Sequence, residues 1–112
     1  MKKQLFKNYT YQFDKNERKI ISTFCKQVVG QMEGDQRFYG EIRAYNSIID
    51  KMNSGDEEIR LTKEEKTKLL LQLKENIKHI KKTMDSSWFI KKWLYKSMLK
   101  QYTNILTTHF EE

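Results

Sequence analysis

Residues 62–84 read TKEEKTKLLLQLKENIKHIKKTM and contain the strongest structural pattern in the chain. Thr62 is followed three residues later by Glu65, the spacing of a capping box in which each side chain satisfies the other residue's free backbone N–H. Five apolar residues then recur at steps of three and four, namely Leu70, Leu73, Ile77, Ile80 and Met84. This a/d seam lasts only about two heptads, so it predicts a bundle helix over 62–84 rather than a long coiled coil.

The same periodicity predicts two helices upstream. The first covers 15–32 and has Asp14 or Asn16 as its N-cap, and the second covers 36–53 with Asp35 as its cap. Their apolar stripes are Ile20, Ile21, Phe24 and Val28 in the first helix, and Phe38, Ile42, Tyr45, Ile49 and Met52 in the second. Residues 54–61 form the clearest loop, because Gly55 is a good helix terminator.

A fourth helix is predicted downstream over 87–107. Its apolar stripe is Ile90, Leu94, Met98, Tyr102 and Ile105. Residues 1–13 are rich in aromatic side chains, and Tyr9, Tyr11 and Phe13 alternate with polar residues as in a strand. No partner strand is evident, so we expect an arm that packs on the helices. The sequence therefore predicts one all-α domain over 1–112, a small antiparallel bundle of about four helices with an aromatic N-terminal arm.

The composition favours a soluble basic protein with long helices. The chain has no proline and only four glycines among 112 residues, and its net charge is +7. Such a charge suits nucleic acid, an anionic membrane surface or an acidic protein, or it serves only to keep the protein soluble. Cys25 is the only cysteine, and no apolar run is long enough to span a membrane. We therefore expect a cytoplasmic protein.

The sequence offers little catalytic chemistry. Neither His79 nor His109 has a histidine or cysteine one turn away, whereas zinc needs three or four convergent ligands. Cys25 lies at the edge of an apolar face, where a cysteine packs as a small hydrophobe. The pairs Glu57–Glu58 and Glu64–Glu65 fall in a loop and a first helical turn, where acidic residues favour the helix dipole. We expect no enzyme, no metal site and no cofactor.

Two surfaces are candidate binding sites. On the face of the fourth helix away from its core stripe, the candidate partner-binding residues are Phe89, Lys92, Trp93, Lys96 and Lys100. Either this face binds a partner, or the arm covers it with Phe6, Tyr9 and Tyr11. On the third helix, the candidate phosphate-contacting residues are Lys63, Lys74, Lys78 and Lys81. The alternative for these lysines is that their stems cover the flank of the core.

Three functions stay open at this point. The first is a protein-interaction module or regulator without catalytic activity, whose partner is another protein or a second copy of the chain. The second is a nucleic-acid-binding protein that uses the lysine stripe of the third helix. The third is an immunity-type protein that acts at the membrane surface through peripheral contact.

Overall fold

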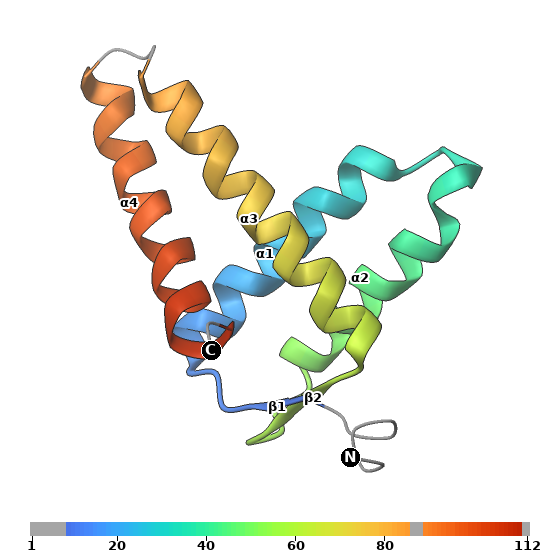
Figure 1. Ribbon diagram of the computed structural model, residues 1–112. Coiled ribbons are helices and arrows are strands. Elements are labelled where there is room, and N and C mark those ends of the chain that lie inside the picture. Colours follow the sequence, from blue (N-terminus) through green and yellow to red (C-terminus); the bar gives the residue numbers. More distant parts are fainter. Residues whose placement is uncertain (1–8, 86–88, 111–112) are drawn as a thin grey trace. The chain divides into compact units, whose positions relative to one another are not determined.

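The computed structural model describes residues 9–85 and 89–110, with the side chains at 84–92 outside that description. The described part of the chain has an all-α fold of four α-helices, as predicted, with a small two-stranded ribbon (Figure 1). The chain divides into two compact units, Met1–Leu69 and Leu70–Glu112, and each is considered by itself. The division runs through the third helix, and a single domain over 1–112 stays a prediction.

Helix α1 spans Lys15–Met32, the bounds predicted from the sequence. Asp14 is the N-cap, and its carboxylate accepts a hydrogen bond of 2.7 Å from the Glu17 backbone N–H. The Glu17 carboxylate in turn accepts one of 3.0 Å from the Asp14 N–H, which completes a capping box. Of the predicted stripe, Ile21, Phe24 and Val28 are buried and Ile20 is half-buried. The apolar stripe of α1 therefore faces the interior of the first unit.

Helix α2 spans Tyr39–Met52 and packs against α1. A 3-10 turn over Gln36–Phe38 precedes it, and the Asp35 carboxylate caps this turn by accepting from the Arg37 N–H at 3.0 Å. Within the predicted stripe, Tyr45 and Met52 are buried, whereas Phe38, Ile42 and Ile49 are only half-buried. Ile48, which the prediction left out, is fully buried. Contacts with the next helix explain why the buried face of α2 is shifted toward Ile48. The Tyr45 hydroxyl donates to the Lys68 carbonyl of the next helix, so that side of α2 is covered as well.

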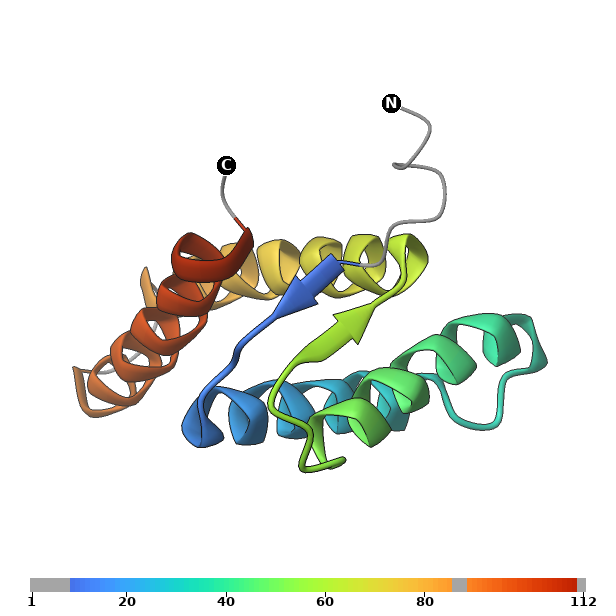
Figure 2. The same cartoon turned by 90° about the horizontal axis from the view of Figure 1, so that it is seen from below.

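Strand β1, Tyr9–Tyr11, pairs antiparallel with strand β2, Ile59–Leu61, as Figures 1 and 2 show. The prediction of a loop over 54–61 was therefore wrong for its last three residues, and the strand-like arm does have a partner. Ile59 and Leu61 are buried while the residue between them is exposed. Three residues are too few for this alternation to stand out in a sequence, and the partner strand lies far away along the chain.

Helix α3 spans Lys63–Asp85, one residue beyond the predicted end. The predicted capping box is present: the Glu65 N–H donates to the Thr62 hydroxyl at 3.1 Å, and the Thr62 N–H donates to the Glu65 carboxylate at 2.9 Å. The buried seam residues are Leu69, Leu73, Ile77 and Ile80. Leu69 thus replaces the predicted Leu70, which is half-buried. The predicted seam residue Met84 has its side chain outside the described part.

Helix α4 spans Phe89–Ile105 and continues into a π-helical turn over Leu106–Phe110. Tyr102 and Ile105 are buried as predicted and Met98 is half-buried, but Leu94 is 52% exposed and was wrongly assigned to the core. Ile90, the first residue of the predicted stripe, has a side chain outside the description. Apolar residues occur on several sides of the first half of α4, so periodicity does not single out one buried face there. No helix among the described residues is long and apolar enough to cross a membrane.

Candidate binding surface on α4

The outer face of α4 carries the most exposed large hydrophobic side chain of the described part, that of Trp93, which is 75% exposed. A shallow groove of about 620 Å³ runs along this face, and we call it the α4 groove. It is lined by Trp93, Lys96, Ser97, Leu99, Lys100, Thr103 and Asn104. Most of these residues follow one another at steps of three and four, so a single helix places them in a row. The site therefore depends on local helix geometry rather than on contacts between elements.

The electrostatic character of the α4 groove is uniformly basic. The sequence contains no acidic residue between Ser86 and Phe110. Lys96 and Lys100 are exposed, and neither forms an ion pair with any side chain that the structure describes. Their positive charges are therefore not neutralised locally, and they lie one helical turn apart beside the exposed indole.

The structure brings together three of the five residues predicted for this surface, namely Trp93, Lys96 and Lys100. Phe89 and Lys92, which the prediction also includes, have side chains outside the described part. The prediction missed the exposed Leu94, because its position at a step of four from Ile90 and Met98 suggested the core. Leu94 does not line the α4 groove, because neighbouring side chains leave a helix about 100° apart.

The described aromatic residues of the arm contact other residues of the first unit. The Lys66 ammonium lies 4.5 Å from the centre of the Tyr9 ring. The Tyr11 ring stacks on Phe13 with 5.3 Å between ring centres, and its burial raises the pKa of Tyr11 to about 12, with a smaller contribution from Tyr9. Phe6, the third residue predicted to cover the α4 face, lies outside the described residues. Trp93 remains largely exposed.

The predicted lysine stripe on α3 is solvent-exposed at all four positions, which are Lys63, Lys74, Lys78 and Lys81. None of them has a hydrogen bond or ion pair with the described residues. The neighbouring Lys51 and Lys68, by contrast, are paired with Glu65 and Glu41. The stripe is therefore free to meet an anion, and it is equally consistent with a solvated helix face.

The other candidate reactive groups do not form a catalytic constellation. His79 is exposed, and burial raises the pKa of the Cys25 thiol to about 12, so that cysteine packs as a hydrophobe as predicted. Glu64 is exposed in the first turn of α3, whereas Glu65 is 6% exposed and accepts hydrogen bonds from Ser47 and Lys51 as well as from its cap. Glu65 therefore has a structural role beyond the predicted dipole interaction.

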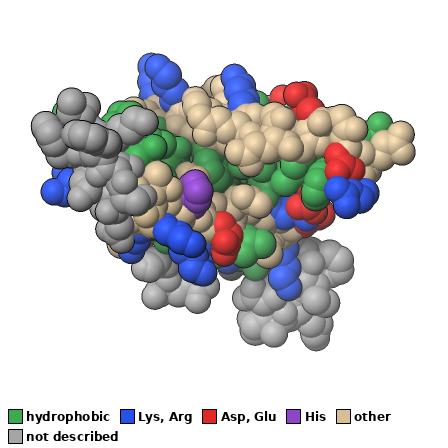
Figure 3. Space-filling model, turned by 90° about the horizontal axis from the view of Figure 1, so that it is seen from above, with side chains coloured by type: hydrophobic (Ala, Val, Ile, Leu, Met, Phe, Trp, Pro, Cys, Tyr) green, Lys and Arg blue, Asp and Glu red, His purple; other side chains and the backbone are tan. Residues whose placement is uncertain are grey.

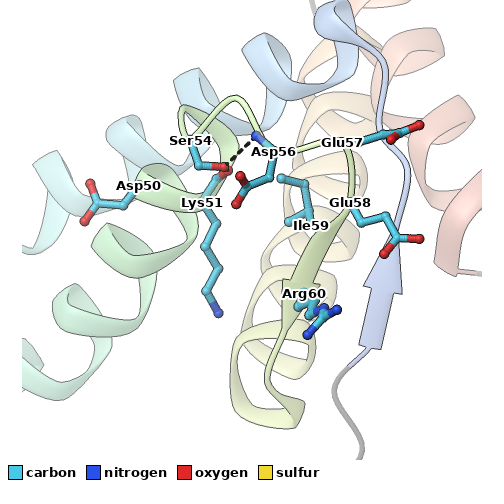
Figure 4. Close-up of a pocket in the computed structure, with 8 residues that line it drawn as sticks. All are labelled: Asp50, Lys51, Ser54, Asp56, Glu57, Glu58, Ile59 and Arg60. Atoms are coloured by element: carbon cyan, nitrogen blue, oxygen red, sulfur yellow. Dashed lines mark hydrogen bonds between the residues drawn. The ribbon is translucent and has the colours of Figure 1, made fainter.

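A second, acidic pocket of about 560 Å³ surrounds the turn that leads into β2. Its lining includes Asp50, Asp56, Glu57 and Glu58, but Figure 4 shows these carboxylates leaving the backbone in different directions. Within the described part of the chain, no group of three potential ligands could hold a metal ion. On the face drawn in Figure 3, hydrophobic side chains reach the surface between charges of both signs. The chain matches no known family model, and neither curated proteins nor solved structures provide a significant match.

Proposed function

We propose that this chain is a protein-interaction module without catalytic activity, and that the α4 groove binds an acidic segment of another protein. The observation that supports this proposal is the exposure of Trp93 beside two lysines whose charges are not neutralised. A tryptophan supplies a large contact area at little cost in conformational entropy, and such residues are enriched among those that dominate binding energy.

The groove indicates what the partner segment must offer. Lys96 and Lys100 are four residues apart, which corresponds to about 6 Å along the helix axis. Carboxylates one helical turn apart on the partner would match this spacing. An apolar side chain on the partner would cover Trp93, which lies at the N-terminal end of the row. The partner that fits best is therefore an acidic amphipathic helix.

A panel of synthetic acidic amphipathic peptides provides the probe, with glutamine analogues of the same peptides as matched controls. We expect the acidic peptides to bind, and Trp93→Ala to weaken binding by about tenfold or more, the loss typical of a dominant interface residue. Lys96→Glu with Lys100→Glu should abolish binding. The free energy of unfolding should stay within about 0.5 kcal/mol of the wild type, as for other surface changes. Leu71→Ala is the matched control, since Leu71 is 57% exposed on α3 outside the groove.

Two results would refute this proposal. Unfolding of the Trp93→Ala variant would make the indole structural, and equal binding of glutamine and glutamate peptides would remove the role of the lysines. Anionic lipid vesicles test the alternative of an immunity-type protein at the membrane surface. Binding to vesicles without binding to any acidic peptide would replace the first proposal with that one.

Nucleic-acid binding through α3 is the second candidate, and it is supported by the exposure of the four unpaired lysines. Each phosphate contact should add about 0.9 to the slope of log affinity against log salt concentration. Lys74→Glu with Lys78→Glu should therefore lower both the affinity for duplex DNA or RNA and this slope. Affinity that is insensitive to salt, or unchanged in the double variant, would exclude the stripe as a phosphate-binding surface.

A further inference from the structure

The turn between α2 and β2, residues 54–58, carries the longest run of acidic residues in the chain, and we call it the acidic turn. Its carboxylates belong to Asp56, Glu57 and Glu58, and all three side chains are exposed. Together with Asp50 they line the acidic pocket of about 560 Å³. Figure 4 shows that these carboxylates spread over the surface of the turn rather than converge on one point. They therefore suit a broad basic surface better than a single bound ion.

The negative charge of the acidic turn is not neutralised within the described part of the chain. None of the four carboxylates that line the acidic pocket forms an ion pair there. The pocket also has two basic residues, Lys51 and Arg60, but the Lys51 ammonium is already paired with Glu65 at 2.6 Å. The four carboxylates thus face one uncompensated cation, that of Arg60, and the pocket keeps a net negative charge.

The α4 groove has the complementary charge and shape. Lys96 and Lys100 are exposed and unpaired with any described residue, and Trp93 beside them is 75% exposed. The acidic pocket has room for one indole, because its volume lies in the range of about 300–1,000 Å³ that encloses whole small molecules. An aromatic side chain seated in a pocket, with polar contacts around it, is typical of residues that dominate an interface.

We propose that the α4 groove of one copy of this chain binds the acidic turn of a second copy. Trp93 of the first copy enters the acidic pocket of the second, and Lys96 and Lys100 face the carboxylates around it. This inference rests on the proposed function, because it uses the same groove and names a partner for it. The contact joins unlike surfaces of the two copies, so it is heterologous. Exposed ion pairs are individually weak, so an acidic peptide that matches the lysine spacing displaces the second copy.

The test follows self-association of the full chain by sedimentation and NMR at about 10 µM to about 1 mM protein, where weak contacts form. We expect the average mass to rise with concentration and to fall at high salt, which screens exposed charges. Amide shifts should change with concentration at residues 54–60 and 93–104. Trp93→Ala should weaken the association by about tenfold or more, as should Lys96→Glu with Lys100→Glu, a second groove variant that keeps the indole.

A mixing experiment identifies the two surfaces. Glu57→Gln with Glu58→Gln removes charge from the acidic turn and leaves the α4 groove intact, whereas Trp93→Ala does the reverse. Each variant alone should stay monomeric. When the unlabelled glutamine variant is added to isotope-labelled Trp93→Ala, the shifts at residues 54–58 of the labelled chain should change and saturate. Addition of unlabelled Trp93→Ala should change nothing. The matched control is Glu33→Gln with Glu75→Gln, which removes the same charge from exposed positions outside the acidic pocket and should self-associate as the wild type does.

Four results would overturn the inference. They are a wild type that stays monomeric at about 1 mM, equal losses in the control and acidic-turn variants, a mixture that shows no recovery, and shift changes between wild type and Trp93→Ala at residues 54–58 that do not depend on concentration. The last result would mean that the groove meets the turn of its own chain. Acidic peptides separate this inference from the proposed function. Peptide binding by a chain that stays monomeric overturns the inference alone, and the absence of both peptide binding and self-association overturns both. A saturating peptide that leaves self-association unchanged would place the contact outside the α4 groove and also overturn the inference.

Discussion

Replacement of Glu65 should destabilise the first unit far more than replacement of its neighbour Glu64. One oxygen of the Glu65 carboxylate accepts from the Lys51 ammonium at 2.6 Å and from the Thr62 N–H at 2.9 Å, and the other accepts from the Ser47 hydroxyl. This buried carboxylate therefore joins α2 to the start of α3. Glu64 is exposed and has only a 3.9 Å approach to Lys68.

The magnitude follows from the number and kind of these hydrogen bonds. A neutral hydrogen bond contributes about 0.5–1.5 kcal/mol and one to a charged group about 1.5–3 kcal/mol. In Glu65→Ala the Lys51 side chain, already one-third exposed, can return to water, which reduces the loss. We expect Glu65→Ala to lower the free energy of unfolding by about 2–4 kcal/mol, and Glu65→Gln by about 1–2 kcal/mol. Glu64→Ala should stay within about 0.5 kcal/mol of the wild type.

The pH dependence provides a second measurement. Burial raises the pKa of Glu65, but the hydrogen bonds from Lys51, Ser47 and Thr62 outweigh burial and lower it below its ordinary value of 4.5. The unfolded state therefore binds the proton first as the pH falls. The stability that the carboxylate contributes is complete above the ordinary value and is lost as the pH falls from 4.5 through the folded pKa.

Urea unfolding followed by far-UV circular dichroism measures both effects. The wild type should lose more stability than Glu65→Gln between neutral pH and the region below 4.5, because the amide does not titrate. Two results would refute the reasoning. One is a cost of Glu65→Ala no larger than that of Glu64→Ala, and the other is parallel acid destabilisation of the wild type and Glu65→Gln.

Three further predictions follow from buried side chains. Tyr45→Phe should cost about 1 kcal/mol in urea unfolding, because it removes the hydrogen bond to the Lys68 carbonyl from a site that is 1% exposed; no measurable change would contradict this. Cys25, fully buried with a pKa of about 12, should react with a thiol reagent at pH 8 only as fast as the protein unfolds, so immediate labelling would contradict its burial. Leu73→Ala should cost about 2–5 kcal/mol, whereas Leu71→Ala should stay within about 0.5 kcal/mol, and equal effects would place the seam at the surface.

Interactions between residues close in the sequence were the ones that could be predicted. The capping boxes at Asp14 and Thr62 each involve residues three positions apart, so the signal is complete within one short stretch. The bounds of α1 and the helical nature of all four long segments follow from such local signals together with a 3.6-residue apolar period. The row of Trp93, Lys96 and Lys100 was predictable for the same reason, because it lies on a single helix.

Contacts between distant segments decided the rest. β1 pairs with a strand that follows two intervening α-helices in the sequence. A strand of three residues is too short for its apolar alternation to predict which segment it pairs with. The neighbours of α2 determine that Ile48 rather than Ile49 is fully buried. Apolar side chains lie on several sides of the first half of α4, so the sequence pattern does not predict that Leu94 is exposed. The groove between α1 and the loop that precedes β2 likewise needs residues 53–57, at least 27 positions further along the chain, to form its second wall. Periodicity identifies an amphipathic helix, but only its packing partners determine which flank of the stripe loses contact with water.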